Sequence, residues 1–176
     1  QFSVAKKVFK DIKNNPTNTI IVNGKPGTGK TILATYLFKY LKEQEETKNL
    51  NIGLVVPMAG LRKTIGKVFS KIKRLKSNMV IGPNDVVKGN YDILIVDESH
   101  RLQRRKGIMG YQAYDNVNKK LGLNKEATQL EWVIQSSKHR IFLYDENQSV
   151  KPADIRPVDF KNLNPKHYQL STQMRV

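Results

Sequence analysis

Residues 24–31 read Gly-Lys-Pro-Gly-Thr-Gly-Lys-Thr, which matches the pattern G-x-x-x-x-G-K-[ST]. Its glycines let the backbone wrap a phosphate group with successive N–H donors, and the N-terminus of a following helix adds a positive field. In this pattern the lysine, Lys30, reaches the β- and γ-phosphates, and the hydroxyl of Thr31 binds Mg²⁺. The sequence therefore predicts an ATP-binding loop that comprises Gly24, Lys25, Pro26, Gly27, Thr28, Gly29, Lys30, Thr31 and Ile32.

A second polar group, Asp97-Glu98-Ser99-His100, follows the apolar run at residues 93–96. Hydrolysis of a bound nucleotide needs a further magnesium ligand and a group that positions or deprotonates water. We expect an aspartate at the carboxyl end of a buried strand beside the P-loop strand to hold the ion, and the adjacent carboxylate to act as a general base. Asp97 is accordingly assigned to the metal together with Thr31, and Glu98 to catalysis together with Lys30.

The elements that must position these groups follow from the spacing of apolar residues. Continuous apolar runs, rather than alternating ones, are typical of a parallel sheet that is covered on both faces. We therefore expect a three-layer α/β domain with a mainly parallel central sheet. The predicted strands are 19–23, 52–56, 93–96 and 141–144, with weaker ones at 79–81 and 168–170. The predicted helices are 2–14, 32–41, 61–72 (with its apolar stripe on Leu61, Ile65, Val68 and Ile72), 115–121 and 127–136, and residues 104–110 are predicted to form a loop.

The composition sets further limits. A chain of 176 residues has room for one hydrophobic core, so residues 1–176 are expected to form a single domain. The absence of cysteine excludes disulfides and thiolate zinc sites and fits a reducing cytoplasm. No window approaches the roughly 18 consecutive apolar residues of a membrane span, so no membrane association is expected. Because the chain begins at Gln1 and not at Met, we expect it to be a piece of a longer protein.

Basic residues greatly outnumber acidic ones, with 31 Lys and Arg against 15 Asp and Glu and a net charge of +16. Such a field attracts polyanions, above all nucleic acid. Two groups of basic residues are candidates for contacts with phosphates. Lys63, Lys67 and Lys71 are at four-residue spacing on one helix face. Arg101, Arg104 and Arg105 follow residues 97–100, which we call the acidic box. A solvated helix face is the alternative interpretation of the lysines, and Tyr111, Tyr114 and Trp132 are either stacking platforms for bases or core residues.

The string Asp97-Glu98-Ser99-His100 resembles the DExx/DExH box of superfamily 1 and 2 helicases, and the resemblance extends along most of the chain. Residues 142–148, Phe-Leu-Tyr-Asp-Glu-Asn-Gln, resemble helicase motif III, in which the glutamine senses the γ-phosphate; this implies such a role for Gln148. Tyr144 stands where that motif usually has glycine.

Residues 170–175 are similar to motif IV, which implies that Arg175 contacts the γ-phosphate. Residues 52–61 look like motif Ia, which touches the nucleic-acid backbone. The resemblance also implies that Gln1 corresponds to the family's adenine-reading glutamine.

Taken together, these motifs most resemble the helicase-like ATPase domain of the Schlafen group 3 type. The resemblance implies a RecA-like P-loop fold, magnesium-dependent ATP hydrolysis and action on DNA or RNA by a first motor domain. A second RecA-like domain would then start at Leu170–Val176 and continue in the same parent chain.

Other classes of P-loop protein fit the sequence less well. A GTPase would need the pattern N-K-x-D to recognise guanine. The similar segment at residues 124–127 reads Asn-Lys-Glu-Ala, with alanine in place of the aspartate, so a GTPase is not favoured. Kinase activity on a small substrate requires neither the acidic box nor Arg175, so a kinase would leave both features unexplained. A nucleotide-dependent switch that binds a protein partner and does not unwind nucleic acid remains an alternative, since Tyr144 departs from motif III.

Overall fold

A parallel sheet forms the centre of the protein, whose computed structural model describes residues 2–148 and 151–170. Over these residues the sheet has six strands in the order β3-β2-β4-β5-β1-β6, and every neighbouring pair is parallel. The strands are β1 (Asn18–Gly24), β2 (Ile52–Val55), β3 (Val80–Ile81), β4 (Tyr91–Val96), β5 (Ser137–Tyr144) and β6 (Lys166–Leu170).

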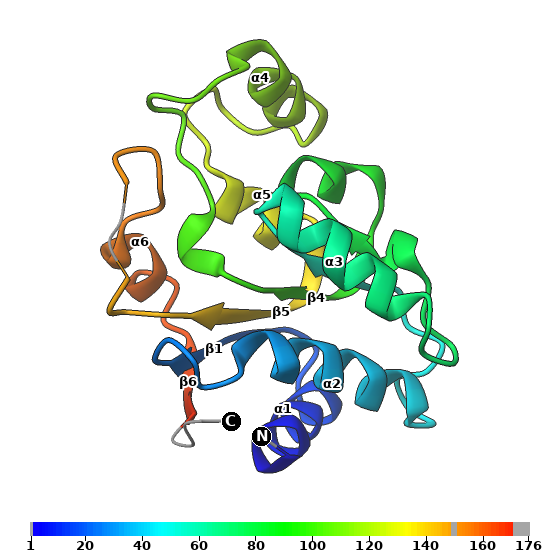
Figure 1. Ribbon diagram of the computed structural model, residues 1–176. Helices are drawn as coiled ribbons and strands as arrows, with labels where there is room; N and C mark the ends of the chain where they lie inside the picture. The colour runs from blue at the N-terminus through cyan, green and yellow to red at the C-terminus, as the bar shows by residue number, and fades with distance from the viewer. Residues whose placement is uncertain (1, 149–150, 171–176) are drawn as a thin grey trace.

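Helices cover both faces of the sheet, as Figure 1 shows. One face packs against α1 (Phe2–Asn14), α2 (Lys30–Glu43) and α3 (Ala59–Phe69), and the other against α4 (Tyr111–Lys120), α5 (Gln129–Gln135) and α6 (Pro157–Lys161). Short 3₁₀ segments lie at η1 (Ser77–Met79), η2 (Pro83–Lys88) and η3 (Ser99–Arg101). Over the described part of the chain, none of the helices has the length and apolar character to cross a bilayer. The predicted three-layer RecA-like fold is confirmed.

Successive side chains of the central strands enter different layers. In β1, Ile20 and Val22 belong to the core under α1, α2 and α3, whereas Ile21 belongs to the core on the opposite face. In a strand, neighbouring residues point to opposite faces, so a strand covered on both sides must be apolar at every position. The continuous apolar runs of the sequence are therefore explained by burial on both faces.

Two of the three aromatic residues considered as stacking platforms belong to the core. Trp132 is fully buried and Tyr114 is nearly so, with their ring centroids 4.5 Å apart. The Tyr114 hydroxyl donates to the Ala127 carbonyl oxygen, which satisfies its polar end inside the protein. Tyr111 is 41% exposed and carries the Arg105 guanidinium over its ring at 4.8 Å.

The third helix is shorter than expected, and one residue of its predicted apolar stripe is exposed. α3 ends at Phe69, so Lys71 and Ile72 lie in the turn that follows. Val68, which was expected in the apolar stripe, is 44% exposed, and Phe69 is buried in its place, at i, i+4 spacing from Ile65. The other predicted stripe residues, Leu61, Ile65 and Ile72, do pack against the core. The prediction of one helix face that carries Lys63, Lys67 and Lys71 was therefore wrong for Lys71.

Candidate functional site

The predicted phosphate loop connects β1 to α2, and three of its glycines have a visible steric reason. Gly27 and Gly29 have φ values of 77° and 81°, in the left-handed region that side chains rarely adopt. A Cβ atom on Gly24 would lie 2.6 Å from the Thr28 hydroxyl oxygen, which leaves no room for a side chain. The loop can therefore fold back tightly over the start of α2, with Gly29 as its N-cap.

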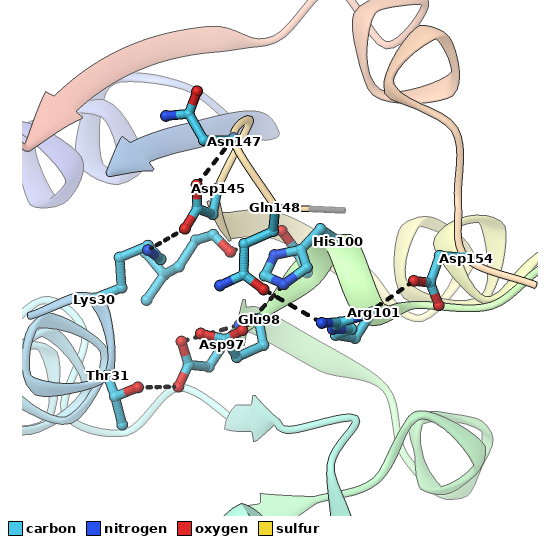
Figure 2. A network of polar contacts seen from close by, with 12 residues as sticks. Lys30, Thr31, Asp97, Glu98, His100, Arg101, Asp145, Asn147, Gln148 and Asp154 are labelled. Carbon is cyan, nitrogen blue, oxygen red and sulfur yellow. Dashed lines mark hydrogen bonds and ion pairs between the residues drawn. The ribbon is translucent and has the colours of Figure 1, made fainter. Parts of the chain in front are cut away.

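Lys30 is buried at this point and has three oxygen partners. Its Nζ atom donates to the carbonyl oxygens of Gly24 at 2.7 Å and Lys25 at 3.1 Å, and it lies 3.3 Å from Asp145 Oδ2. Figure 2 shows this ion pair between the start of α2 and the segment after β5. The ammonium group is thus held at the mouth of the loop by contacts from two sides.

Thr31 and Asp97 meet across the site. The Thr31 hydroxyl donates to Asp97 Oδ2 at 2.7 Å, and the Glu98 N–H donates to the other carboxylate oxygen at 3.0 Å (Figure 2). Burial raises the pKa of the Asp97 carboxyl above its ordinary value, although the hydrogen bond from Thr31 acts in the opposite direction. A hydroxyl oxygen beside a carboxylate is the oxygen-donor chemistry that suits Mg²⁺.

The donor set fits an ion that also keeps water and phosphate ligands. Within residues 2–148 and 151–170, no group of three or more His, Cys, Asp or Glu side chains could hold a metal ion. Mg²⁺ is commonly bound through one or two protein ligands together with substrate phosphates and water. Thr31 and Asp97 match that arrangement and do not match a cage made of protein alone.

Glu98 lies beside this pair in an unusual backbone conformation. Its φ of 49° and ψ of 43° are in the left-handed region, which is costly for a residue with a side chain and clusters at functional sites. Its Oε2 atom lies 3.1 Å from Nε2 of the buried His100, without the alignment of a hydrogen bond. The contact with His100 holds the pKa of the Glu98 carboxyl below its ordinary value, against the opposing effect of burial.

The strand that carries Asp97 does not lie beside the P-loop strand, contrary to the expectation from the sequence. β5 separates β4 from β1, and its last residues lead into Asp145. Asp145 is therefore a residue of the site that was not predicted from the sequence; it is buried and faces Lys30. A signal for it existed, because an aspartate directly after a buried apolar run is the same pattern that identified Asp97.

The remaining predicted residues, apart from the arginines that follow residues 97–100, fall into three groups. Gln148 lies on the same side of the site as Glu98 and His100 in Figure 2, and its amide oxygen lies 3.4 Å from a guanidinium nitrogen of Arg101. Gln1 and Arg175 lie outside the described residues, so the roles implied for them stay predictions. Lys63, Lys67 and Lys71 are exposed.

The three arginines after the acidic box are already engaged within the protein. Arg101 pairs with Asp154 at 3.3 Å, and Arg105 forms a bidentate pair with Asp115 at 2.6 and 3.0 Å. Arg104 donates to the carbonyl oxygens of Asp154 and Pro152. Their predicted contact with nucleic acid stays a prediction, and the structure adds that each guanidinium has an internal partner.

Comparison with known proteins places these features in context. Similar solved structures include Pif1 helicase from Bacteroides in complex with ADP-AlF3 and ssDNA (TM-score 0.49, 14% identity, covering 97% of this chain and 42% of that chain). AMPPCP-bound DnaA from Aquifex aeolicus is another (TM-score 0.47, 14% identity, 94% of this chain and 45% of that chain). Myosin-2A from Naumovozyma castellii is 30% identical over 70 residues, which make up 39% of this chain and 4% of that protein.

The chain thus spans less than half of these solved chains and a small fraction of its curated relative. A family model covers most of it: the model for the Schlafen group 3 DNA/RNA helicase domain matches residues 17–176. The chain belongs to the Schlafen group 3 DNA/RNA helicase domain family and is a helicase-like P-loop domain.

Proposed function

We propose that this domain binds ATP together with Mg²⁺ and hydrolyses it, as the first motor domain of a helicase-like protein that acts on DNA or RNA. The observation that carries the proposal is the 2.7 Å contact between the Thr31 hydroxyl and Asp97 Oδ2 beside the phosphate loop. It brings together the two oxygen ligands that this chemistry needs, and Glu98 is the next residue.

Each residue of the site then has a distinct task. The backbone of residues 24–29 and the ammonium group of Lys30 bind the phosphates, and Thr31 and Asp97 hold the metal ion. A magnesium ion at that position would neutralise charge on the β- and γ-phosphates. Asp145 keeps the Lys30 ammonium oriented through their ion pair.

Glu98 is proposed to orient the attacking water and to accept its proton. A general base must be ionised to act, and the lowered pKa of Glu98 favours the ionised form at neutral pH. Gln148, Arg175 and Gln1 are assigned the roles that the family resemblance implies: the first two sense the γ-phosphate, and Gln1 reads the adenine.

Nucleic acid is the proposed track of the motor. The family is that of a DNA/RNA helicase domain, the net charge is +16, and the lysines of α3 are exposed. A polyanion is attracted by such a field. We further propose that a second RecA-like domain follows in the parent chain, starting at Leu170–Val176, and that the protein works in the cytoplasm.

A second candidate function is a nucleotide-dependent switch that binds a protein partner without unwinding. One observation favours it: Tyr144 replaces the glycine that motif III usually has, and its ring packs against Phe160 at 4.8 Å, with His100 at 6.3 Å. A bulky residue fixed at that turn would restrict the movement through which nucleic acid and hydrolysis are coupled.

The test is ATP hydrolysis by the complete parent protein, measured with and without single-stranded DNA and single-stranded RNA. Glu98→Gln serves as the blank, and Glu45→Gln, at a side chain that is 82% exposed, is the matched control. Stimulation by one nucleic acid would support the motor and identify its track. Hydrolysis that is indifferent to both would favour the switch, and normal turnover by Glu98→Gln would refute the assignment of the base.

A further inference from the structure

Arg101 connects the segment after the acidic box to the segment after β5. One guanidinium nitrogen, Nη1, lies 3.3 Å from Asp154 Oδ2, and the other, Nη2, lies 3.4 Å from Gln148 Oε1. Figure 2 shows the guanidinium between these two side chains, with Gln148 on the side of Glu98 and Lys30. The arginine side chain is 28% exposed and the Asp154 side chain 4% exposed, so the pair is largely shielded from water.

The anchor of this arginine is fixed by the backbone. Asp154 Oδ2 also accepts from the Lys151 N–H at 2.9 Å. The Arg104 N–H donates to the Ala153 carbonyl oxygen, and the Ile155 N–H donates to that of Leu102. These contacts hold the two segments side by side, and Arg101 therefore has a defined position relative to η3 and Glu98.

This geometry determines which end of the Gln148 amide faces the site. A guanidinium carries only donors, whereas an amide has one acceptor oxygen and one donor NH₂ group. Arg101 must therefore bind the amide oxygen, and the NH₂ group then points away from Arg101, toward the side of Lys30 in Figure 2. Phosphate oxygens are acceptors, so an NH₂ group is the end that can bind them.

We propose that Arg101 is a positioning residue for ATP hydrolysis: held by Asp154, it orients the Gln148 amide so that its NH₂ group is presented to the terminal phosphate. The proposal rests on the proposed function. It differs from the role that the sequence suggested for Arg101, because the two terminal nitrogens engaged here serve the hydrolytic site and not a nucleic-acid strand.

The experiment measures steady-state ATP hydrolysis by the complete parent protein in the absence of nucleic acid. The variants are Arg101→Ala, Arg101→Lys and Asp154→Asn, with Lys106→Ala as the control at a neighbouring exposed residue. We expect Arg101→Ala to lower kcat about tenfold or more, because a misplaced group at a reacting centre is costly, while KM for ATP changes little. Arg101→Lys keeps a donor for Gln148 and is expected to recover part of the rate.

A double-mutant cycle separates positioning from general damage to the fold. Gln148→Ala should lower kcat about as much as Arg101→Ala, and the double variant should lose little more than either single variant, since both changes remove the same oriented amide. Gln148→Glu should also be slow, because it retains an acceptor for Arg101 and lacks the NH₂ donor. Additive losses in the cycle would overturn the proposal.

The remaining outcomes are distinguishable. If Arg101→Ala hydrolyses ATP at the normal rate but binds single-stranded nucleic acid more weakly, with a reduced dependence on salt, Arg101 is a nucleic-acid contact and the proposal is wrong. Unchanged binding of a non-hydrolysable ATP analogue is expected for Arg101→Ala, whereas its thermal midpoint should fall, because the buried Asp154 loses its charged partner. The rates are therefore compared well below that midpoint. If the wild-type protein does not hydrolyse ATP at all, the proposed function fails, and this role fails with it.

Discussion

Charged residues occupy opposite surroundings at the carboxyl edge of the sheet and on α3. At the edge, Lys30, Asp97 and Asp145 are almost fully buried, and each has a partner within hydrogen-bond or ion-pair distance. On α3, Lys63 and Lys67 are exposed to solvent. A buried charge is costly unless it is paired, whereas an exposed lysine costs little. Substitutions at the edge should therefore disturb the placement of groups in the hydrolytic site, and substitutions on α3 should change only the local positive charge that attracts nucleic acid.

Lys30→Ala is expected to have the largest effect. It removes the cation proposed to contact the phosphates, and losing one electrostatic group of this kind costs about 10²–10³ in rate. ATP hydrolysis by the parent protein checks this, with Lys39→Ala, at a 45% exposed side chain on the same helix, as the control. If Lys30→Ala and Lys39→Ala hydrolysed ATP at the same rate, the buried edge of the sheet and the exposed helix surface would not differ as expected.

Charge reversal on α3 should come next. The double variant Lys63→Glu/Lys67→Glu is expected to weaken binding of single-stranded nucleic acid about tenfold or more, and to reduce the slope of log affinity against log salt by about 1.4 for two lost contacts. The thermal midpoint should not change. Lys6→Glu/Lys10→Glu on α1 changes the net charge equally at exposed residues. An equal loss in both variants would mean that total charge, and not α3, attracts the strand.

Asp97→Asn should slow hydrolysis and yet stabilise the fold. Because burial raises the pKa of Asp97, the folded protein binds this proton more readily than the unfolded chain. The protonated Asp97 carboxyl contributes its full stabilisation below the ordinary pKa of an aspartate. This contribution is lost as the pH rises through the pKa of Asp97 in the folded protein. At neutral pH the buried carboxylate is therefore unfavourable.

The Asp97→Asn variant should therefore be more stable than the wild type at neutral pH, with a higher thermal midpoint. The introduced amide keeps an oxygen for the Glu98 N–H, and its NH₂ group can donate to Thr31. Glu98→Gln should show no such gain, because the pKa of Glu98 is lowered. A decrease in stability for Asp97→Asn would contradict this account.

Arg105→Ala is expected to have the smallest effect of the four. Its pair with Asp115 lies toward solvent, with side-chain exposures of 18% and 33%, and such pairs contribute little. The thermal midpoint should fall slightly, by less than Asp97→Asn raises it, and ATP hydrolysis should be unchanged. Weaker nucleic-acid binding by this variant would show that Arg105 behaves like the α3 lysines.

The fold was largely predictable from the sequence. The central strands are buried on both faces, and this gives the continuous apolar runs that are typical of a covered parallel sheet. The limits of β5 were less visible: it begins at Ser137, although Lys138, His139 and Arg140 interrupt the apolar pattern. α6 has five residues, which is too short for a helical period to show.

The candidate site was predictable in its parts and not in its assembly. The motifs at residues 24–31 and 97–98 are local, so they can be recognised in the sequence. The structure places Thr31 and Asp97 in contact. The order of the strands in the sheet depends on the crossover connections and cannot be inferred from the apolar runs of the individual strands. The position of β5 between β1 and β4 was therefore not predicted. The Lys30–Asp145 pair spans 115 residues of sequence, and no local pattern encodes it.

The position of β1 has a consequence for synthesis of the protein. β1 pairs with β5 and β6, both of which come late in the chain, and Asn18 lies 121 residues before its partner His139. At about 5–20 residues per second, the strand that carries the phosphate loop leaves the ribosome on the order of ten seconds before a neighbour exists for it. During that interval its unpaired backbone edges and its apolar faces are open to other chains, so the domain is expected to depend on chaperones while it is being translated.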